Sequence, residues 1–577
     1  MRRMLPVLGG FVLLLFSTAA TAQTAPPAPG QQPPPRTMPG MPAPPRDSPQ
    51  EKTGTAALSG RVVAADTGKP LRRALVRASS QETPQGRSVS TDPDGRWQLK
   101  NLPAGSYRIS VSKGGYVDIA YGQLRPFEAG KVLELADGQA VEKLDVTLPR
   151  AGVITGRVVD EFGEPLTGAR VQPSRYRYVG GQRRLTPIAI GDTTDDIGQF
   201  RLHGLSPGDY FVSAQMQAGL MFGQSDDRVG YGTTYFPGTA VQTEAQRVTV
   251  ALGRETSQIN ITMATSRIAT ISGTAVSSSG RPITRGVLML SSNVGGANMM
   301  TMGTPLKPDG SFLFSNVSPG EYRIQVQHTP NADEVVVLSS GGAPGTESGS
   351  VSVTVTGNDV AGLTIVTSPG ATASGRVVFE GAAKPPITPA ALNIAAPPAE
   401  FGMMMMAGNA RIRDDWTFEA MGLTERRRFR VVNPPTGWYL KSVSHEGNDI
   451  TDTGIDFKEG QQVGGIDIVL TQRVTDLSGT VQDPRAKPVT DFVVVAFSSD
   501  STRWGYMTRF VRTARPNQES RFSIKGLPPD EYYVIALDYL EMGEEGDPEQ
   551  LEKWKGNATR ITLTDGEPKS LTLKLNQ

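Results

Sequence analysis

The stretch GRWQLKNLPAGSY, from Gly95 to Tyr107, occurs four times in this chain with the same spacing. It returns as GQFRLHGLSPGDY from Gly198 to Tyr210 and as GSFLFSNVSPGEY from Gly310 to Tyr322. A fourth copy, SRFSIKGLPPDEY from Ser520 to Tyr532, has serine and aspartate in the two places that hold glycine in the others. Copies separated by roughly the length of a small domain indicate a chain built of similar domains.

Each copy has the pattern of two strands joined by a turn. Apolar and polar residues alternate on both sides of the turn, which is typical of strands with one buried face. The glycine that opens the motif suits a turn with positive φ. A Tyr placed just after the second turn resembles the tyrosine corner of β-sandwiches, whose hydroxyl bonds to nearby backbone. We therefore expect core and turn roles for Gly95, Trp97, Tyr107, Gly198, Phe200, Tyr210, Gly310, Phe312, Tyr322, Phe522 and Tyr532.

Two further markers accompany the motif. A Ser-Gly or Thr-Gly pair lies in an upstream apolar stretch, and an alternating apolar stretch after a glycine closes each unit. The glycines of the first marker, Gly60, Gly156, Gly273, Gly375 and Gly479, are 96, 117, 102 and 104 residues apart. The closing stretches begin their alternation at Leu144, Ile259, Leu363, Ile466 and Leu571. These periods are too long for solenoid repeats and match sandwich domains of about seven strands.

The prediction is an all-β protein, a tandem array of about five Greek-key, seven-stranded β-sandwiches. The expected domains are repeat 1 (57–149), repeat 2 (150–266), repeat 3 (267–369), repeat 4 (370–473) and repeat 5 (474–577). Repeat 4 is degenerate, because Thr424-Glu-Arg-Arg-Arg428 replaces the Pro-Gly turn. One short helix is expected between Glu541 and Lys555, in an excursion of repeat 5.

The N-terminal residues have the features of an export signal. Arg2 and Arg3 precede an apolar stretch and a small-residue cleavage site, so residues 1–22 are expected to be a signal peptide cleaved before Gln23. An uncleaved anchor is the alternative. Residues 23–56 form a Pro-rich disordered linker. These features predict a periplasmic or extracellular protein, without a membrane span in the mature chain.

The motifs S-G-x-V, G-x-P-L, D-G-x-F/W-x-L and L-x-P-G-x-Y together resemble the carboxypeptidase regulatory-like domain. This is a transthyretin-like sandwich that is appended to metallocarboxypeptidases and repeated in bacterial exported proteins. The resemblance covers about residues 57–577, is good in repeats 1 and 2 and weak in repeat 4. It implies a sandwich used as an accessory module, related to starch-binding and Cna-B domains, and it implies no catalytic activity of its own.

The composition leaves few routes to catalysis. The 577 residues include no Cys and only three His, namely His203, His328 and His445, which lie in three different repeats. We therefore expect no catalytic residues, no cofactor and no metal site. The Met clusters at 299–302 and 403–406 are interpreted as apolar loop contacts rather than Cu(I) ligands. The net charge of +1 does not favour nucleic acid as a partner.

We interpret the chain as a non-enzymatic, monomeric exported scaffold that binds an unidentified protein or glycan partner. One alternative is carbohydrate binding by aromatic rings exposed on one or more repeats, and another is an accessory module for a separately encoded enzyme. The candidate glycan or partner contacts are the aromatic residues outside the core markers. They are Tyr176, Tyr178, Tyr231, Tyr235, Phe236, Trp438, Trp504 and Tyr506.

Overall fold

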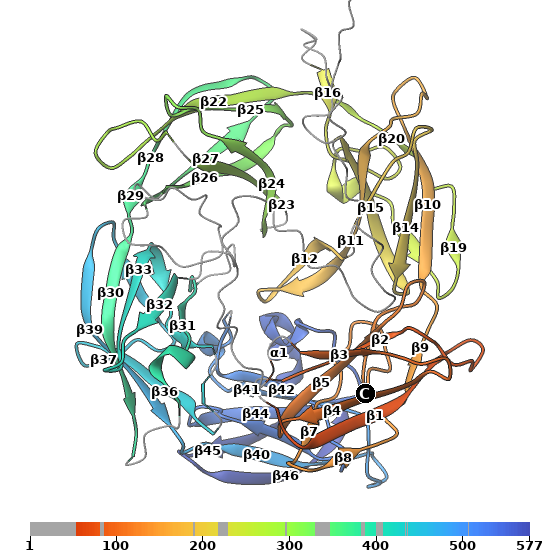
Figure 1. Ribbon diagram of the computed structural model, residues 1–577, viewed down its shortest axis with the longest axis vertical. Helices are drawn as coiled ribbons and strands as arrows, with labels where there is room; N and C mark the ends of the chain where they lie inside the picture. Colours follow the sequence, from red (N-terminus) through yellow and green to blue (C-terminus); the bar gives the residue numbers. More distant parts are fainter. Residues whose placement is uncertain are drawn as a thin grey trace, which may run out of the picture. The chain divides into compact units, whose positions relative to one another are not determined.

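A computed structural model describes residues 53–576 of the chain, with gaps in its description. The gaps are residues 81–82, 84–85, 189–190, 217–228, 285, 295–296, 329–346, 382–386, 400–407, 433, 436 and 506. The signal peptide, most of the linker, the Met403–Met406 cluster and Tyr506 lie outside the described residues. The described part is almost entirely β-structure, as the sequence predicts, and Figure 1 shows its strands. No helix in the described part is long and apolar enough to cross a membrane.

Repeat 1 is built of two sheets. One holds β4 (Arg96–Leu102), β1 (Ala56–Ala64), β8 (Ala140–Val141) and β9 (Val146–Leu148). The other holds β3 (Arg87–Ser90), β2 (Leu75–Ser79), β5 (Gly105–Ser112), β6 (Ile119–Ala120) and β7 (Leu133–Leu135). The side chains of Trp97, Tyr107, Ile109 and Val111 point into the core between them, as the alternation predicts.

Repeats 2 and 3 follow the same plan. In repeat 2 the first sheet holds β14 (Gln199–Leu205), β10 (Gly152–Val159), β19 (Glu255–Thr256) and β20 (Ile261–Thr262). Its second sheet holds β12 (Gln182–Pro187), β11 (Ala169–Val179), β13 (Asp192–Thr193), β15 (Gly208–Met216), β17 (Thr234–Tyr235) and β18 (Val248–Val250). A separate pair joins β16 (Val229–Tyr231) to β21 (Thr265–Arg267). In repeat 3, β25 (Ser311–Val317), β22 (Ala269–Val276) and β28 (Val360–Val366) face β24 (Ala297–Pro305), β23 (Val287–Val294), β26 (Gly320–His328), β27 (Glu347–Val355) and β29 (Ser368–Pro369).

In repeats 4 and 5 the hydrogen-bonded strands run continuously from one layer to the other. Repeat 4 joins β35 (Arg430–Val431), β31 (Ile394–Ala396), β32 (Gly408–Ile412), β33 (Thr417–Leu423), β30 (Ala371–Phe379), β39 (Gln462–Thr471), β36 (Tyr439–His445) and β37 (Asn448–Asp449). It also contains the pair β34 (Glu425–Arg427) and β38 (Ile455–Phe457). Repeat 5 joins β42 (Val511–Ala514), β41 (Val493–Ser498), β44 (Asp530–Leu537), β45 (Thr559–Leu563), β46 (Pro568–Asn576), β40 (Asp476–Gln482) and β43 (Phe522–Lys525). Each repeat has a hydrophobic core of its own, and repeat 5 has a second, smaller one.

The glycine of the first marker has the same structural reason in all five repeats. In repeat 1, a Cβ placed on Gly60 would lie 2.2 Å from the carbonyl oxygen of Leu144. The corresponding distances run from Gly156 to Ile259 (1.9 Å), Gly273 to Leu363 (2.1 Å), Gly375 to Ile466 (1.8 Å) and Gly479 to Leu571 (1.9 Å). Only glycine therefore lets the first strand of a repeat approach the strand that closes it.

The predicted tyrosine corner is present in the four repeats that carry the motif. Each hydroxyl donates a hydrogen bond to the backbone oxygen four residues earlier. The bonds are Tyr107 to Pro103 (2.8 Å), Tyr210 to Ser206 (2.6 Å), Tyr322 to Ser318 (2.9 Å) and Tyr532 to Pro528 (2.8 Å). Burial raises the pKa of Tyr210 to about 12, so its hydroxyl keeps the proton that it donates.

In repeat 4 an arginine performs this task. The Arg427 side chain is buried, and its Nε donates to the Thr424 backbone oxygen over 2.7 Å. Its Nη1 donates to the Ala396 oxygen over 3.3 Å, which ties the corner to β31. Burial lowers the pKa of Arg427. The altered turn of repeat 4 thus keeps a polar tie between a core side chain and the corner backbone.

An ion-pair cluster joins repeat 4 to repeat 5. Arg509 of repeat 5 binds the Asp452 carboxylate of repeat 4 through two nitrogens, over 3.1 and 2.6 Å. Arg430 binds the same carboxylate over 3.3 Å. The cluster is mostly shielded from solvent, because both arginine side chains are 14% exposed.

Candidate functional site

Repeat 5 differs from the other repeats by an excursion, residues 538–558, between β44 and β45. It contains a 3-10 turn, η5 (Glu544–Gly546), and the helix α1 (Pro548–Lys555), which confirms the predicted helix. The Asp547 carboxylate accepts a hydrogen bond from the Glu549 N–H, and Pro548 opens the first turn. These are ordinary N-cap signals, and they fix where the helix begins.

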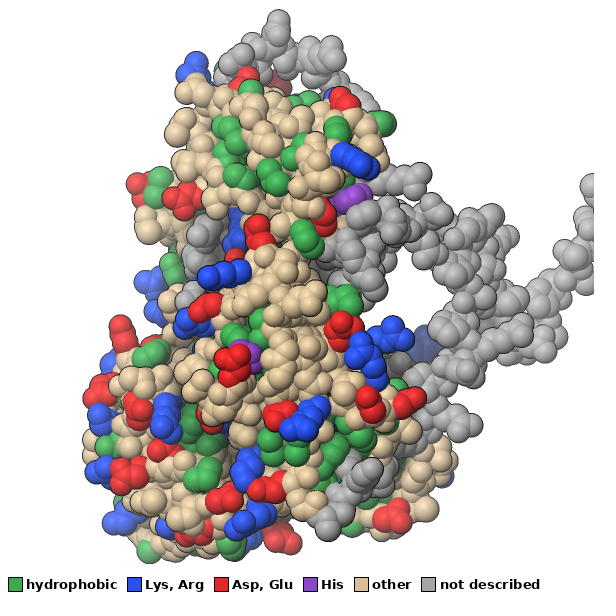
Figure 2. Space-filling view, turned by 90° about the vertical axis from the view of Figure 1, so that its left-hand side faces the viewer, with side chains coloured by type: hydrophobic (Ala, Val, Ile, Leu, Met, Phe, Trp, Pro, Cys, Tyr) green, Lys and Arg blue, Asp and Glu red, His purple; other side chains and the backbone are tan. Residues whose placement is uncertain are grey.

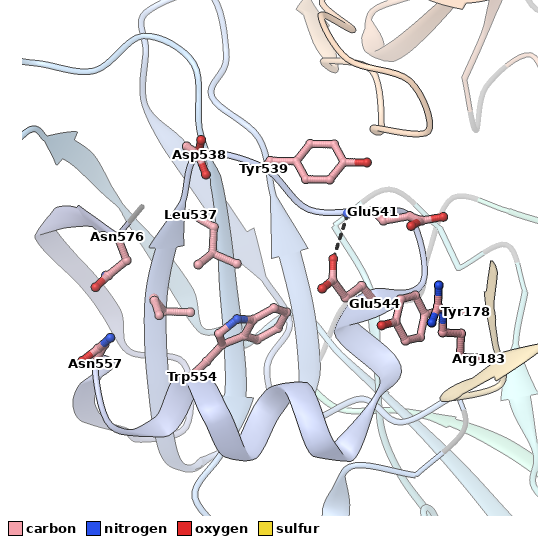
Figure 3. A pocket seen from close by; sticks show the side chains of 11 residues that line it. Tyr178, Arg183, Leu537, Asp538, Tyr539, Glu541, Glu544, Trp554, Asn557 and Asn576 are labelled. Atoms are coloured by element: carbon pink, nitrogen blue, oxygen red, sulfur yellow. Dashed lines mark hydrogen bonds between the residues drawn. The ribbon is translucent and has the colours of Figure 1, made fainter. Parts of the chain in front are cut away.

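A pocket with a volume of about 390 Å³ lies beside this excursion. Figure 3 shows the side chains that line it: most come from β44, α1 and the excursion, and two come from the β11–β12 hairpin of repeat 2. The lining residues are Tyr178, Arg183, Ile535, Leu537, Asp538, Tyr539, Glu541, Glu544, Trp554, Asn557 and Asn576. The pocket therefore combines three aromatic rings with carboxylates, amides and one guanidinium.

One side of the pocket is apolar. Ile535 and Leu537 belong to the second core of repeat 5, and the Trp554 ring packs against that core from α1. Trp554 is only half-buried, and its indole N–H has no hydrogen-bond partner among the described residues. The Asn557 side chain is exposed and likewise makes no hydrogen bond within the described part of the chain. Two groups that can donate hydrogen bonds thus remain available beside an apolar surface.

The carboxylates of the pocket are already compensated. Asp538 pairs with Arg125 over 3.2 Å, and Glu541 pairs with Arg175 over 2.8 Å. Glu544 accepts a hydrogen bond from the Glu541 N–H over 3.1 Å. Burial and the neighbouring carboxylates raise the pKa of Glu544. The pocket is therefore less anionic than its three acidic residues alone would make it.

The same excursion contacts repeats 1 and 2, and we call this contact the 1–2–5 junction. It is formed by residues 125–131 of repeat 1, residues 175–183 of repeat 2, and residues 490–491, 515 and 538–550 of repeat 5. The Tyr539 hydroxyl donates to the Pro126 oxygen over 3.1 Å, and the Met542 N–H donates to the Phe127 oxygen. The Arg175 guanidinium carbon lies 3.2 Å from the centre of the Phe127 ring.

Two glycines permit the close backbone approach at the 1–2–5 junction. A Cβ on Gly543 would lie 2.5 Å from the Tyr178 oxygen, and a Cβ on Gly181 would lie 2.4 Å from the Gly546 oxygen. Both have positive φ, which glycine adopts readily. The hairpin of repeat 2 and the excursion of repeat 5 thus touch through their main chains.

The most deeply buried charges of the junction are a carboxylate of repeat 1 and a guanidinium of repeat 5. Arg515 binds Glu128 over 2.6 Å and Asp491 over 2.6 Å. The second oxygen of Glu128 accepts hydrogen bonds from the N–H groups of Leu124 and Arg125. Lys131 adds a further ion pair to Asp491 over 3.2 Å.

The structure scatters the aromatic residues predicted as contacts. Tyr178 lines the pocket, and Tyr176, two residues earlier on β11, packs edge-on against Phe211. The Tyr231 hydroxyl donates to Glu161 over 2.8 Å. Tyr235 is half-buried in a turn closed by backbone bonds to Thr239.

The other three aromatic candidates belong to the cores. Phe236 packs against the core of repeat 2. Trp438 and Trp504 are each 3% exposed, and the Trp504 N–H donates to the Ser498 oxygen. These two indoles are filled into the interiors of repeats 4 and 5, so they are not exposed rings.

Sequence reasoning did not single out most of the pocket. Trp554, Tyr539 and Asn557 were not among the candidates, although the excursion that carries them was recognised as a helix. The available signal was that only repeat 5 inserts a helix between two strands of its sandwich. Among the described residues, no three His, Cys, Asp or Glu side chains are grouped so that they could hold a metal ion.

Comparison with known families identifies the first domain. The family model of the carboxypeptidase regulatory-like domain matches residues 57–149. Repeat 1 is a carboxypeptidase regulatory-like domain. The match confirms the resemblance that the motifs suggested, and its ends coincide with the predicted bounds of repeat 1. A comparison with curated proteins found no match.

Solved structures with a similar fold include tandem sandwiches beside which this carboxypeptidase regulatory-like domain and its neighbours can be set. GBS52, the minor pilin of Streptococcus agalactiae, is 15% identical, with 36% of this chain and 95% of that chain covered and a TM-score of 0.21. The shaft pilin SpaA of Lactobacillus rhamnosus GG is 14% identical, with 37% and 98% covered and a TM-score of 0.17. The Bacillus anthracis TIE protein is 9% identical, with 90% and 73% covered and a TM-score of 0.14. Similarity at this level says nothing about what the chain binds.

Proposed function

We propose that the protein is a non-enzymatic exported scaffold that binds a partner of the cell envelope or cell surface. The observation that carries this proposal is the 1–2–5 junction. It fixes three sandwich domains against one another through a shielded ion pair, Arg515 with Glu128, and through main-chain contacts. Domains held in this way present a composite surface that no single repeat has.

The character of the domains supports a binding role. Repeat 1 belongs to a family that is non-catalytic. On the face seen in Figure 2, acidic and basic side chains are interspersed, in keeping with the net charge of +1. Such a surface exerts little long-range attraction on polyanions, so recognition would depend on local contacts.

The experiment is to express the full chain with a C-terminal tag, fractionate the cells and determine the N-terminus of the purified protein. We expect a protein outside the cytoplasm that begins at Gln23 and binds envelope preparations saturably, without turning over peptide or glycosidic substrates. Retention in the cytoplasm, or hydrolysis that co-purifies with the chain and persists in the Arg515→Met variant, would overturn the proposal.

A second candidate function is carbohydrate binding. The observation that favours it is the pocket beside α1, where aromatic rings and amides meet. A saccharide partner would make the scaffold an envelope- or surface-glycan-binding protein. Its site would differ from the sequence prediction, because of the predicted aromatic contacts only Tyr178 lines this pocket.

A further inference from the structure

We propose that the pocket beside α1 binds a neutral saccharide, which stacks on Trp554 and forms hydrogen bonds with Asn557, Asn576 and Asp538. The inference rests on the proposed function of the chain as a binding protein, and it names the ligand class and the site. The pocket volume of about 390 Å³ falls in the range of sites for small ligands.

The apolar side of the pocket suits the carbon face of a sugar ring. Trp554 offers a large flat surface that is backed by the second core of repeat 5, so the ring is held in place. In Figure 3 the Trp554 ring lies beside Leu537, with Asn557 and Asn576 on one side of it and Glu544 and Tyr178 on the other. An apolar platform flanked by polar side chains matches a molecule that has an apolar face and a hydroxylated edge.

The charges of the pocket argue against an ionic ligand. An anion would meet three acidic residues, and the one lining cation, Arg183, lies over the Tyr176 ring at 5.1 Å. A cation would meet carboxylates that already have partners, because Asp538 pairs with Arg125 and Glu541 pairs with Arg175. A neutral hydroxylated ligand gains hydrogen bonds with these groups and needs no charge of its own to be buried.

The free hydrogen-bonding groups also point to a hydroxylated ligand. The Trp554 N–H and the Asn557 amide have no partners in the described part of the chain, and the Asp538 side chain is 44% exposed. Donors and an acceptor therefore surround one apolar surface. A purely apolar ligand would remove these groups from water without replacing their hydrogen bonds, at a cost in free energy.

The site is completed by two repeats. Tyr178 and Arg183 come from repeat 2, while the other nine lining residues belong to repeat 5. The full pocket therefore exists only where the 1–2–5 junction is closed. A ligand that touches both sides stabilises the closed junction by mass action, and opening the junction weakens its binding by the same linkage.

The test is a calorimetric titration of the mature full chain, residues 23–577, with neutral oligosaccharides: maltotetraose, cellotetraose and chitotetraose. Oligomers of a uronic acid serve as the anionic contrast. We expect at least one neutral oligosaccharide to bind with one site per chain and the anionic oligomers to bind more weakly. Trp554→Ala should weaken binding by at least about tenfold, as expected for truncation of a central aromatic contact.

Two further variants make the test specific. Asn557→Ala removes an exposed amide with no partner, so its fold is preserved and its affinity should fall. Phe162→Ala removes a ring that is 83% exposed in a turn of repeat 2 outside the pocket, so its affinity should not change. Binding that survives both Trp554→Ala and Asn557→Ala overturns the assignment to this pocket while leaving a glycan-binding function in place. No binding of any neutral oligosaccharide, by a chain that still binds envelope preparations, overturns the ligand class and leaves the scaffold function standing.

Discussion

The guanidinium of Arg515 and the carboxylate of Glu128 form an ion pair of 2.6 Å in which the two side chains are only 6% and 4% exposed. They come from repeat 5 and repeat 1. Asp491 binds a second nitrogen of the same guanidinium over 2.6 Å. Charges shielded to this degree are tolerated because each has a charged partner and further hydrogen bonds.

Removal of Arg515 should open the 1–2–5 junction. In Arg515→Met, Glu128 keeps its backbone donors but loses its cation, and loss of one partner of a buried pair costs about 3–5 kcal/mol. We expect faster hydrogen exchange at residues 124–131 and 538–546, and earlier proteolytic cleavage there. The matched control is Arg560→Met, whose partner Glu531 is well exposed, and which should change stability by about 1 kcal/mol or less. Equal protection in Arg515→Met and the wild type would contradict the role of the pair.

The first-strand glycines should tolerate no side chain. In Gly375→Ala the new Cβ would lie 1.8 Å from the Ile466 oxygen, so β30 and β39 must separate. We expect repeat 4 to lose about 3 kcal/mol or more, as overpacking against backbone does. Gly464→Ala in the same repeat is the control, since its nearest neighbour is the Ser374 Oγ at 3.7 Å. Calorimetry should show a lowered transition for the first variant only.

The tyrosine corner can be tested with a neighbouring pair of tyrosines. Tyr532→Phe removes the hydrogen bond to the Pro528 oxygen, which then remains without that donor, and should cost about 1–2 kcal/mol. Tyr533→Phe is the control, because its hydroxyl has no hydrogen bond within the described residues. Hydrogen exchange across β44 should accelerate in Tyr532→Phe and remain unchanged in Tyr533→Phe. Identical exchange in the two variants would refute a stabilising corner bond.

Acid should loosen the contact between repeats 4 and 5. Burial alone would raise the pKa of Asp452, but the hydrogen bond and charge of Arg509, together with Arg430 and Arg428, lower it. The carboxylate is therefore favoured in the folded state, and its stabilisation is present above its ordinary pKa of 3.8 and lost as the pH falls through the lowered value. Thermal melting followed from about pH 6 to about pH 3 should show this loss in the wild type. Asp452→Asn should be less stable at the upper end and should show a shallower decline; parallel curves would exclude Asp452 as a contributor.

The pattern of the sequence predicts the interior of each repeat better than its exterior. The tyrosine corners were predicted because alternation and turn chemistry act locally. The first-strand glycines were recognised as markers, but their reason needs a partner strand nearly one hundred residues away, such as Leu144 for Gly60. Arg427 resembled a solvated loop charge, and only the fold shows that its side chain is buried.

The pocket could not be predicted because it depends on contacts between repeats. Trp438 and Trp504 were predicted as contact rings and lie in the cores, because an indole has the same sequence signature in either place. Trp554 was overlooked within a short charged helix. Its environment is set by β44 behind it, and the pocket is completed by Tyr178 from repeat 2. No periodicity within repeat 5 carries information about the hairpin of another domain.

The tie between Tyr539 and Pro126 spans 413 positions of the chain. During synthesis and export, residues 124–131 appear long before the excursion that covers them. Glu128 must then spend that interval hydrated, and the early sandwiches have to become stable without their final neighbour. Closure is accordingly the last step of maturation, and a chain interrupted before residue 515 would present an uncovered acidic loop that a quality-control protease could recognise.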